Sequence, residues 1–182
     1  MTLGQVMENI EDVIAESLDV VEKVYKGRFY YERQYLRELT VKAMRLANCD
    51  ILYDKAIESL GEGWVAEETL AIALYCAIRH LDSVEDAIIA SVNHSDDSDS
   101  TGSVCGNIMG AIYGYEHLKE RNIFCRQGKK LEDTLELADV ILAIADDLFT
   151  SCIISEYDPI DTPEKKQWEM RYCYMRSAVL VR

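Results

Sequence analysis

A short polar stretch near the middle of this 182-residue chain gathers the side chains best suited to hold a cation. Three aspartates lie there among four hydroxyl residues. The stretch comprises Ser95, Asp96, Asp97, Ser98, Asp99, Ser100 and Thr101. Carboxylate and hydroxyl oxygens are hard ligands, which suit magnesium or calcium better than zinc. Acids this close repel one another unless a cation or solvent screens their charges.

A helix start offers a second explanation for the same residues. Aspartate, serine and threonine are preferred N-caps, and the helix dipole favours carboxylates in the first turn. One acid would satisfy that role, so the cluster exceeds what capping needs. Residue chemistry alone leaves two interpretations open, a metal site and a solvated acidic loop.

The segment that follows the acids must position them. We predict a helix of small residues in which Gly102, Gly106, Gly110 and Gly114 recur at every fourth position. Glycines with this spacing share one helix face, and a face without side chains lets another backbone come close. We therefore expect the glycine face to bring this helix, and the acids at its start, close to the core.

The composition predicts one globular domain over residues 1–182. The chain is 49% hydrophobic and 29% charged, and its two prolines and nine glycines leave little room for a linker. The net charge of −14 argues against nucleic acid and against anionic membrane surfaces as partners. Met1 is followed by an acidic amphipathic stretch, and no apolar run approaches a membrane span, so we expect a cytoplasmic protein.

The six cysteines form no CxxC pair. Four of them, Cys76, Cys105, Cys152 and Cys173, lie in apolar helical stretches, where we expect buried free thiols rather than a disulfide framework.

Apolar residues recur every three or four positions through most of the chain, as in helices that bury one face. A capping pair of Ser83 and Asp86 is expected to open one of these helices. The predicted helices cover residues 3–25, 30–48, 51–60, 66–80, 84–92, the glycine-stepped segment, 131–151 and 163–175. No segment shows the sustained alternation typical of strands, so the fold class is predicted to be all-α, a compact irregular or orthogonal bundle.

Arginine and tyrosine alternate near the start of the second predicted helix, over residues 28–37. Such a mixture can contact a phosphate or a nucleobase. Arginine and tyrosine on a helix more often cover the edge of a core, and we favour that interpretation.

The histidines and possible nucleophiles point to no covalent chemistry. His80, His94 and His117 do not form a pair at zinc-ligand spacing, and no serine sits in a GxSxG turn. His94 precedes the acids by two residues and could border a site, although a lone histidine at a helix end is more often a cap.

Two segments in combination carry a family resemblance. The first, GEGWVAEETLAIAL, begins at Gly61, and taken alone it is a helix C-cap followed by a turn. The second, SVNHSDDSDSTG, begins at Ser91 and leads into the glycine-stepped helix. Together they resemble the ADP-ribosylglycohydrolase family, which includes dinitrogenase-reductase-activating glycohydrolases and ADP-ribosyl-acceptor hydrolases. The likeness is strongest over residues 48–148, where a later Ala-Asp-Asp-Leu segment resembles the closing helix of the family.

The resemblance implies an all-α hydrolase with a binuclear Mg²⁺ site that cleaves the bond between ADP-ribose and its acceptor. The D-x-D-(S/T) metal motif of the family falls on Asp97, Asp99 and Ser100. The same match suggests a set of substrate-binding residues. These are Gly63, Trp64, Asn93, His94 and Thr101. No catalytic base is assigned, although Glu62, Glu67 and Glu68 lie close to the first motif.

The chain departs from the family pattern in two ways. Asp96 stands where the family usually has glycine. The GDALG-like and Thr-Asp-Asp segments, which supply the other metal ligands in the family, are missing between Met1 and Ser91. The chain therefore resembles an N-terminally shortened member that carries half of the metal site.

Three hypotheses follow. The first is an ADP-ribosylglycohydrolase whose missing ligands come from a partner chain or a second copy. The second is a non-catalytic helical module for binding or oligomerisation. The third is a plain helical scaffold, which the family likeness disfavours.

Overall fold

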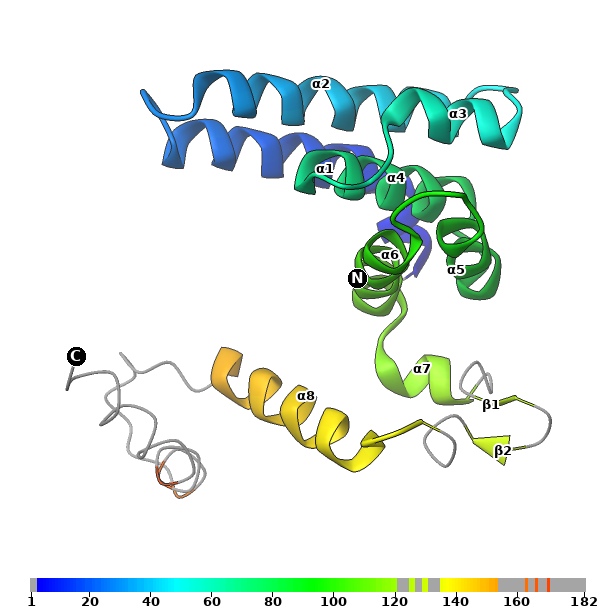
Figure 1. The fold of residues 1–182 in the computed structure, drawn as a ribbon. Coiled ribbons are helices and arrows are strands. Elements are labelled where there is room, and N and C mark those ends of the chain that lie inside the picture. The colour runs from blue at the N-terminus through cyan, green and yellow to red at the C-terminus, as the bar shows by residue number, and fades with distance from the viewer. Residues whose placement is uncertain are drawn as a thin grey trace. The chain divides into compact units, whose positions relative to one another are not determined.

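The fold is that of a computed structural model, which describes residues 3–120, 125–126, 129–130, 135–153 and the single positions 163, 166 and 170. Contacts between residues group the chain into two compact units, residues 1–123 and 124–182 (Figure 1), and each is described by itself. The expectation of a single domain over residues 1–182 stays a prediction.

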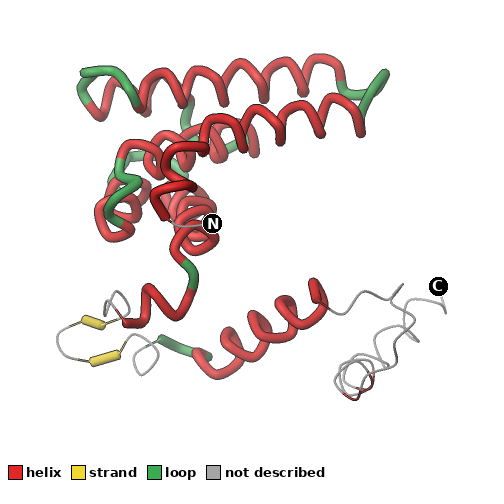
Figure 2. The backbone as a smooth tube through the Cα atoms, turned by 180° about the vertical axis from the view of Figure 1, so that it is seen from behind, coloured by secondary structure: helices red, strands yellow, loops and turns green. Residues whose placement is uncertain are grey.

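The first unit is built of helices. These are α1 (Leu3–Val24), α2 (Tyr30–Ala47), α3 (Tyr53–Leu60), α4 (Ala66–Arg79), α5 (Val84–Val92), α6 (Ser98–Tyr113) and α7 (Tyr115–Glu120). Helices α1 and α2 form a long hairpin whose arms lie side by side (Figure 2). Helix α4 packs on α2, α3, α5 and α6, and is therefore the central element of this unit.

The sequence of α4 explains its central place. Its apolar residues surround the whole helix rather than one face, which is typical of a helix buried on all sides. Ile72, Tyr75 and Cys76 are fully buried, and they face a core that includes Met109 and Cys105 of α6. The acids that follow α5 therefore lie between two helices, α5 and α6, that both pack on this central helix.

The second unit contains β1 (Cys125–Arg126), β2 (Lys129–Lys130) and α8 (Ala138–Ile153). The two strands pair antiparallel, with Cys125 opposite Lys130, and are too short to change the all-α class, which is confirmed. Helix α8 begins later than predicted, at residue 138 instead of 131. Residues 135–137 form a bend and a turn, and Leu137 has a left-handed backbone (φ 59°) that ends any helix running into it.

The five helices predicted over residues 3–92 agree with the structure to within two residues at each end, and α5 has the predicted bounds. Helix α6 is the predicted glycine-stepped helix, whereas α7 was not predicted. Ser83 caps α5 as expected, because its Oγ accepts the Asp86 N–H at 3.2 Å. The last predicted helix, over residues 163–175, lies mostly outside the described residues. The three described positions within it, Pro163, Lys166 and Met170, are helical. No helix of the described ranges combines the length and apolar character needed to cross a membrane.

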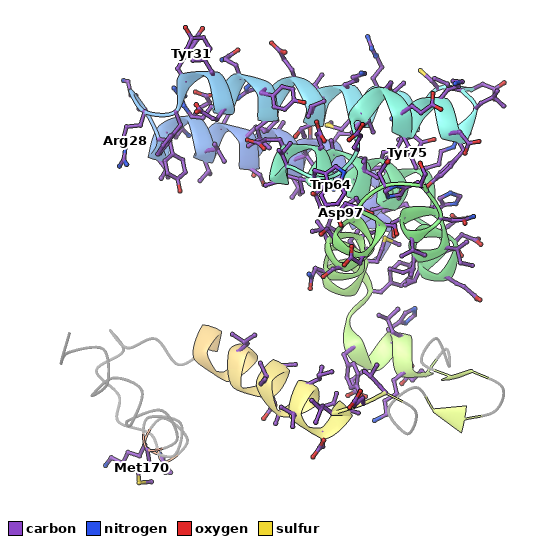
Figure 3. The ribbon with its side chains drawn as sticks, viewed as in Figure 1. Arg28, Tyr31, Trp64, Tyr75, Asp97 and Met170 are labelled. Atoms are coloured by element: carbon purple, nitrogen blue, oxygen red, sulfur yellow. The ribbon has the colours of Figure 1, made fainter. Side chains whose placement is uncertain are left out.

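Two expectations about side chains have different outcomes. Cys76 and Cys105 are buried free thiols, as predicted, and burial raises the pKa of Cys76 to about 12; the side chains of Cys152 and Cys173 lie outside the described residues. The prediction that the tyrosines of α2 cover a core edge is wrong at its start. Tyr30 and Tyr31 are 62% and 82% exposed in the first turn of α2. Tyr31 points away from α1 (Figure 3).

Candidate functional site

The acidic segment lies between α5 and α6. Asn93 is the C-cap residue of α5, and Asp97 is the N-cap residue of α6. The Asp97 side chain makes no capping hydrogen bond to the helix. The capping explanation therefore does not account for this carboxylate, which is available for another partner.

Asp97 is the N-cap residue of α6, and Asp99 is the second residue of the helix. A side-chain hydrogen bond with Asp97, followed by the backbone N–H groups of Ser100 and of Asp99 itself, holds the pKa of the Asp99 carboxyl below its usual range. Acids this close in the chain repel one another unless a cation or solvent screens their charges. The structure brings together these two residues, which the sequence paired as metal ligands, and Ser100 follows them on the same turn.

A buried hydroxyl fixes the other end of the acidic segment. Thr101 is fully buried, and its Oγ1 donates to the Ser91 carbonyl at 2.7 Å. His94 Nε2 lies 2.8 Å from the same Oγ1. Because the one hydroxyl proton is directed at Ser91, His94 Nε2 is the donor in this contact. The Asp96 N–H then approaches the unprotonated His94 Nδ1 at 3.4 Å.

The loop between α3 and α4 lies directly against the acidic segment. The Asp97 N–H donates to the Glu62 carbonyl at 3.1 Å. Gly63 is so close to α6 that a Cβ at this position would lie 3.2 Å from Thr101 Cγ2 and 3.6 Å from Asp97 Cβ. Trp64 and Asp97 therefore belong to neighbouring loops (Figure 3), and the two motifs that carry the family resemblance form one surface.

Side chains of α4 and α2 hold this loop in place, and the sequence did not assign them a role. Glu68 Oε2 accepts the N–H groups of Glu62 and Gly63 at 3.1 and 3.2 Å. Tyr35 donates its hydroxyl to Glu68 Oε1 at 3.2 Å, and Thr69 donates to the Gly63 carbonyl at 2.6 Å. An acid at the third position of a helix that follows a glycine loop is the signal that could have identified Glu68.

A pocket of about 530 Å³ opens beside the two loops. Its lining is acidic, with one large aromatic side chain, Trp64, that is 71% exposed. The lining residues are Glu58, Gly61, Glu62, Trp64, Val65, Glu68 and Asp96. An exposed indole beside carboxylates offers a flat face for stacking and a negative field for a cationic group.

The five predicted substrate-binding residues differ in their access to solvent. Asn93 and Trp64 are exposed and His94 is half-buried, whereas Gly63 and Thr101 are buried beneath the loops. The structure places all five around the start of α6 or in the loop that packs on it, and their role toward a substrate stays a prediction.

The stepped glycines only partly fulfil the expectation of close approach. A Cβ at Gly102 would lie 2.4 Å from Val92 Cγ1, so α5 and α6 do approach closely there. A Cβ at Gly106 would make an ordinary contact, and one at Gly110 or Gly114 would meet no described atom within 4 Å. Gly114 has φ 77° and ends the helix. The close approach is therefore confined to the end of α6 that carries the acids.

The donor set near Asp97 fits part of a hard-cation site. Two carboxylates and a neighbouring hydroxyl are oxygen ligands that Mg²⁺ accepts, with water completing its six positions. Among the described residues, no group of three or more histidines, cysteines or acids is arranged to hold a metal ion. The described residues therefore offer at most part of a metal site, and cation binding at Asp97, Asp99 and Ser100 stays a prediction.

Comparison with known proteins places these motifs in context. The profile described as ADP-ribosylglycohydrolase matches residues 2–156. The human ADP-ribosylhydrolase ARH3 is 25% identical over 128 residues, which cover 65% of this chain and 35% of that protein. The ADP-ribosylarginine hydrolase Tri1 of Serratia proteamaculans is 31% identical over 84 residues, which cover 46% of this chain and 22% of Tri1. The matched part of the chain thus spans about a third of the length of ARH3 and about a fifth of that of Tri1, and no solved structure matches it.

Proposed function

Because the chain belongs to the ADP-ribosylglycohydrolase family, we propose that it acts on the glycosidic bond between ADP-ribose and an acceptor and holds Mg²⁺ at Asp97, Asp99 and Ser100. One observation carries the proposal. Asp97 and Asp99 both lie at the start of α6, and the Asp97 side chain makes no capping hydrogen bond to the helix.

The proposed chemistry is electrostatic. A bound Mg²⁺ would orient the ribose hydroxyls and a water molecule at the anomeric carbon, where the transition state resembles an oxocarbenium ion. Asp97 and Asp99 contribute the negative charge that keeps the cation in place. Their own positions depend on the Glu62 carbonyl, which accepts the Asp97 N–H, and on the hydrogen bond between Thr101 and His94.

The exposed residues at the rim are proposed to contact the substrate. Trp64 offers its indole face beside the acidic pocket, and Asn93 is exposed at the end of α5. His94 is partly accessible, while Gly63 and Thr101 are buried and are proposed to support the loops that carry these residues. We expect the ligands that complete a binuclear site to come from a partner chain or a second copy of this chain.

A non-catalytic binding module is the second candidate. It is favoured by the number of ligands, because the described residues include no group of three or more histidines, cysteines or acids around a common centre. Such a module would bind a cation weakly and retain the helical core without turnover.

The test uses the full chain, in which Mg²⁺ binding is followed by calorimetry and ADP-ribose release from an ADP-ribosylated protein is measured in parallel. Asp97→Asn and Asp99→Asn should each weaken Mg²⁺ binding by about tenfold or more, because each removes a charged ligand. Glu85→Gln is the matched control, since it changes an exposed acid of the preceding helix α5 that does not line the pocket.

Turnover that is lost in the two variants and kept in the control supports the enzyme. Magnesium binding without turnover favours the binding module. If all three variants and the parent chain bind Mg²⁺ equally, or not at all, the proposed half-site is wrong.

A further inference from the structure

Both carboxylate oxygens of Glu68 accept hydrogen bonds from other parts of this chain. Its Oε2 accepts two backbone N–H groups of the α3–α4 loop, from Glu62 and Gly63, and its Oε1 accepts the hydroxyl of Tyr35 on α2. Three of the roughly four lone-pair sites of this carboxylate are therefore occupied by donors of this chain. These contacts fix its orientation toward the loop, as expected of a structural carboxylate.

The loop that Glu68 holds is the one that contacts the acidic segment. Glu62 donates its N–H to Glu68 and accepts the Asp97 N–H at its own carbonyl, at 3.1 Å in each case. The backbone of Glu62 thus links the Glu68 carboxylate to the backbone of Asp97. Gly63, the second residue bound by Glu68, packs against Asp97 and Thr101.

The surroundings of Glu68 fix its side chain in this orientation. It is the third residue of α4, where a carboxylate is favoured by the helix dipole. Gly61 lies against it so closely that an added Cβ would be 2.4 Å from Glu68 Cδ and 2.6 Å from Cγ. The chain leaves space for this carboxylate by having no side chain at position 61.

We propose that Glu68 is a positioning residue, which holds Asp97 in place for cation binding through the backbone of Glu62 and Gly63 and is neither the base nor a metal ligand. The inference rests on the proposed function, because Glu68 can affect Mg²⁺ binding only if Asp97 is a ligand of the cation. Tyr35 supports the same role, because its hydroxyl donates to Glu68 Oε1 and so links α2 to this carboxylate.

Replacement by glutamine separates geometry from charge. The glutamine carbonyl can accept both backbone N–H groups, and its amide can donate to the Tyr35 oxygen, so Glu68→Gln retains the three contacts without the charge. Glu68→Ala removes all three. A positioning role predicts that glutamine rescues what alanine loses, whereas a base or a metal ligand would be lost equally in both variants.

The first measurement is hydrogen exchange at the Asp97 amide, which does not depend on magnesium. We expect exchange to quicken about tenfold or more in Glu68→Ala and to change less than about threefold in Glu68→Gln, because the Glu62 carbonyl that protects this amide is held only in the second variant. Tyr35→Phe is the control that removes one donor of three, and it should stay close to the parent chain.

The second measurement is the Mg²⁺ affinity of the same variants. It should fall in Glu68→Ala and recover in Glu68→Gln. If the alanine variant does not fold, Glu68→Asp replaces it, since a side chain shorter by one methylene withdraws the carboxylate from the loop.

The outcomes separate the two proposals. Unchanged exchange at Asp97 in Glu68→Ala, or a Glu68→Gln variant as impaired as the alanine variant, overturns the positioning role. If the parent chain binds no Mg²⁺ while exchange at Asp97 responds as expected, the positioning of Asp97 stands and the proposed magnesium function is wrong.

Discussion

Two connections in the first unit look alike locally and differ in what surrounds them. The α1–α2 connection contains Gly27 (φ 79°) and Phe29 (φ 51°), and the α3–α4 loop contains Gly61 (φ 123°) and Gly63 (φ 81°). Both therefore reverse the chain through left-handed backbone. At the first connection a Cβ on Gly27 would meet no described atom within 4 Å, whereas at the second both glycines face close neighbours.

The hydrogen bonds show the same contrast. The described backbone bonds of the α1–α2 connection are local, such as Arg28 N–H to the Tyr25 carbonyl at 2.9 Å. The α3–α4 loop also has a local partner, Glu68, but in addition it accepts the N–H of Asp97, which is distant in the sequence. A turn is therefore marked as part of a site by the distant groups that hold it, because local turn geometry occurs in both places.

The largest expected effect tests this contrast with matched glycine substitutions. Gly61→Ala should lower the free energy of unfolding by about 3 kcal/mol, because φ 123° strains any side chain and the new Cβ would lie 2.4 Å from Glu68 Cδ. Gly27→Ala carries backbone strain alone and should cost about 1 kcal/mol. Urea denaturation of both variants checks the difference, and equal losses would show that the surroundings of Gly61 do not matter.

The second prediction concerns the buried hydroxyl that joins His94 to the end of α5. Thr101→Val keeps the shape of the side chain but leaves the Ser91 carbonyl and His94 Nε2 without this partner, which should cost about 1–3 kcal/mol. Thr101→Ser keeps the hydroxyl and removes a methyl group, so it should cost about 1 kcal/mol. Thermal melts of the two variants decide whether the hydroxyl or the methyl group holds the acidic segment, and the reverse order would contradict the hydrogen-bond assignment.

The sequence predicted those parts of the molecule that depend on local patterns. Periodicity gave helices α1 to α5, Ser83 gave the start of α5, and the spacing of Asp97 and Asp99 placed two carboxylates at the start of α6. These features involve residues within a few positions of one another. Local physics therefore suffices for them.

The rest of the site depends on contacts between distant segments. No local pattern shows that Tyr35 of α2 reaches Glu68, or that the Glu62 carbonyl accepts the Asp97 N–H. The glycine steps of α6 illustrate the same limit, because equal spacing in the sequence does not distinguish Gly102, which faces Val92, from Gly110, which faces no described neighbour.

The third prediction compares the two ends of α6, where the acid-bearing end is close to α5 and the far end is not. Gly102→Ala places a Cβ 2.4 Å from Val92 Cγ1, and valine is stiff about χ1, so we expect a net loss of about 1 kcal/mol despite the better helix propensity of alanine. Denaturation in urea measures the loss. A variant as stable as the parent chain would mean that α5 shifts freely and that close approach is not needed there.

The smallest effect is expected at Gly110, and its sign is opposite. Gly110 lies inside α6, and a Cβ added there would meet no described atom within 4 Å. Gly110→Ala should therefore stabilise the chain by up to about 1 kcal/mol, the difference in helix propensity between the two residues. A loss of stability in urea would reveal a neighbour of this face, and Mg²⁺ binding that changed with it would extend the site to the far end of α6. An unchanged affinity together with higher stability would confine the requirement for glycine to the end that carries Asp97 and Asp99.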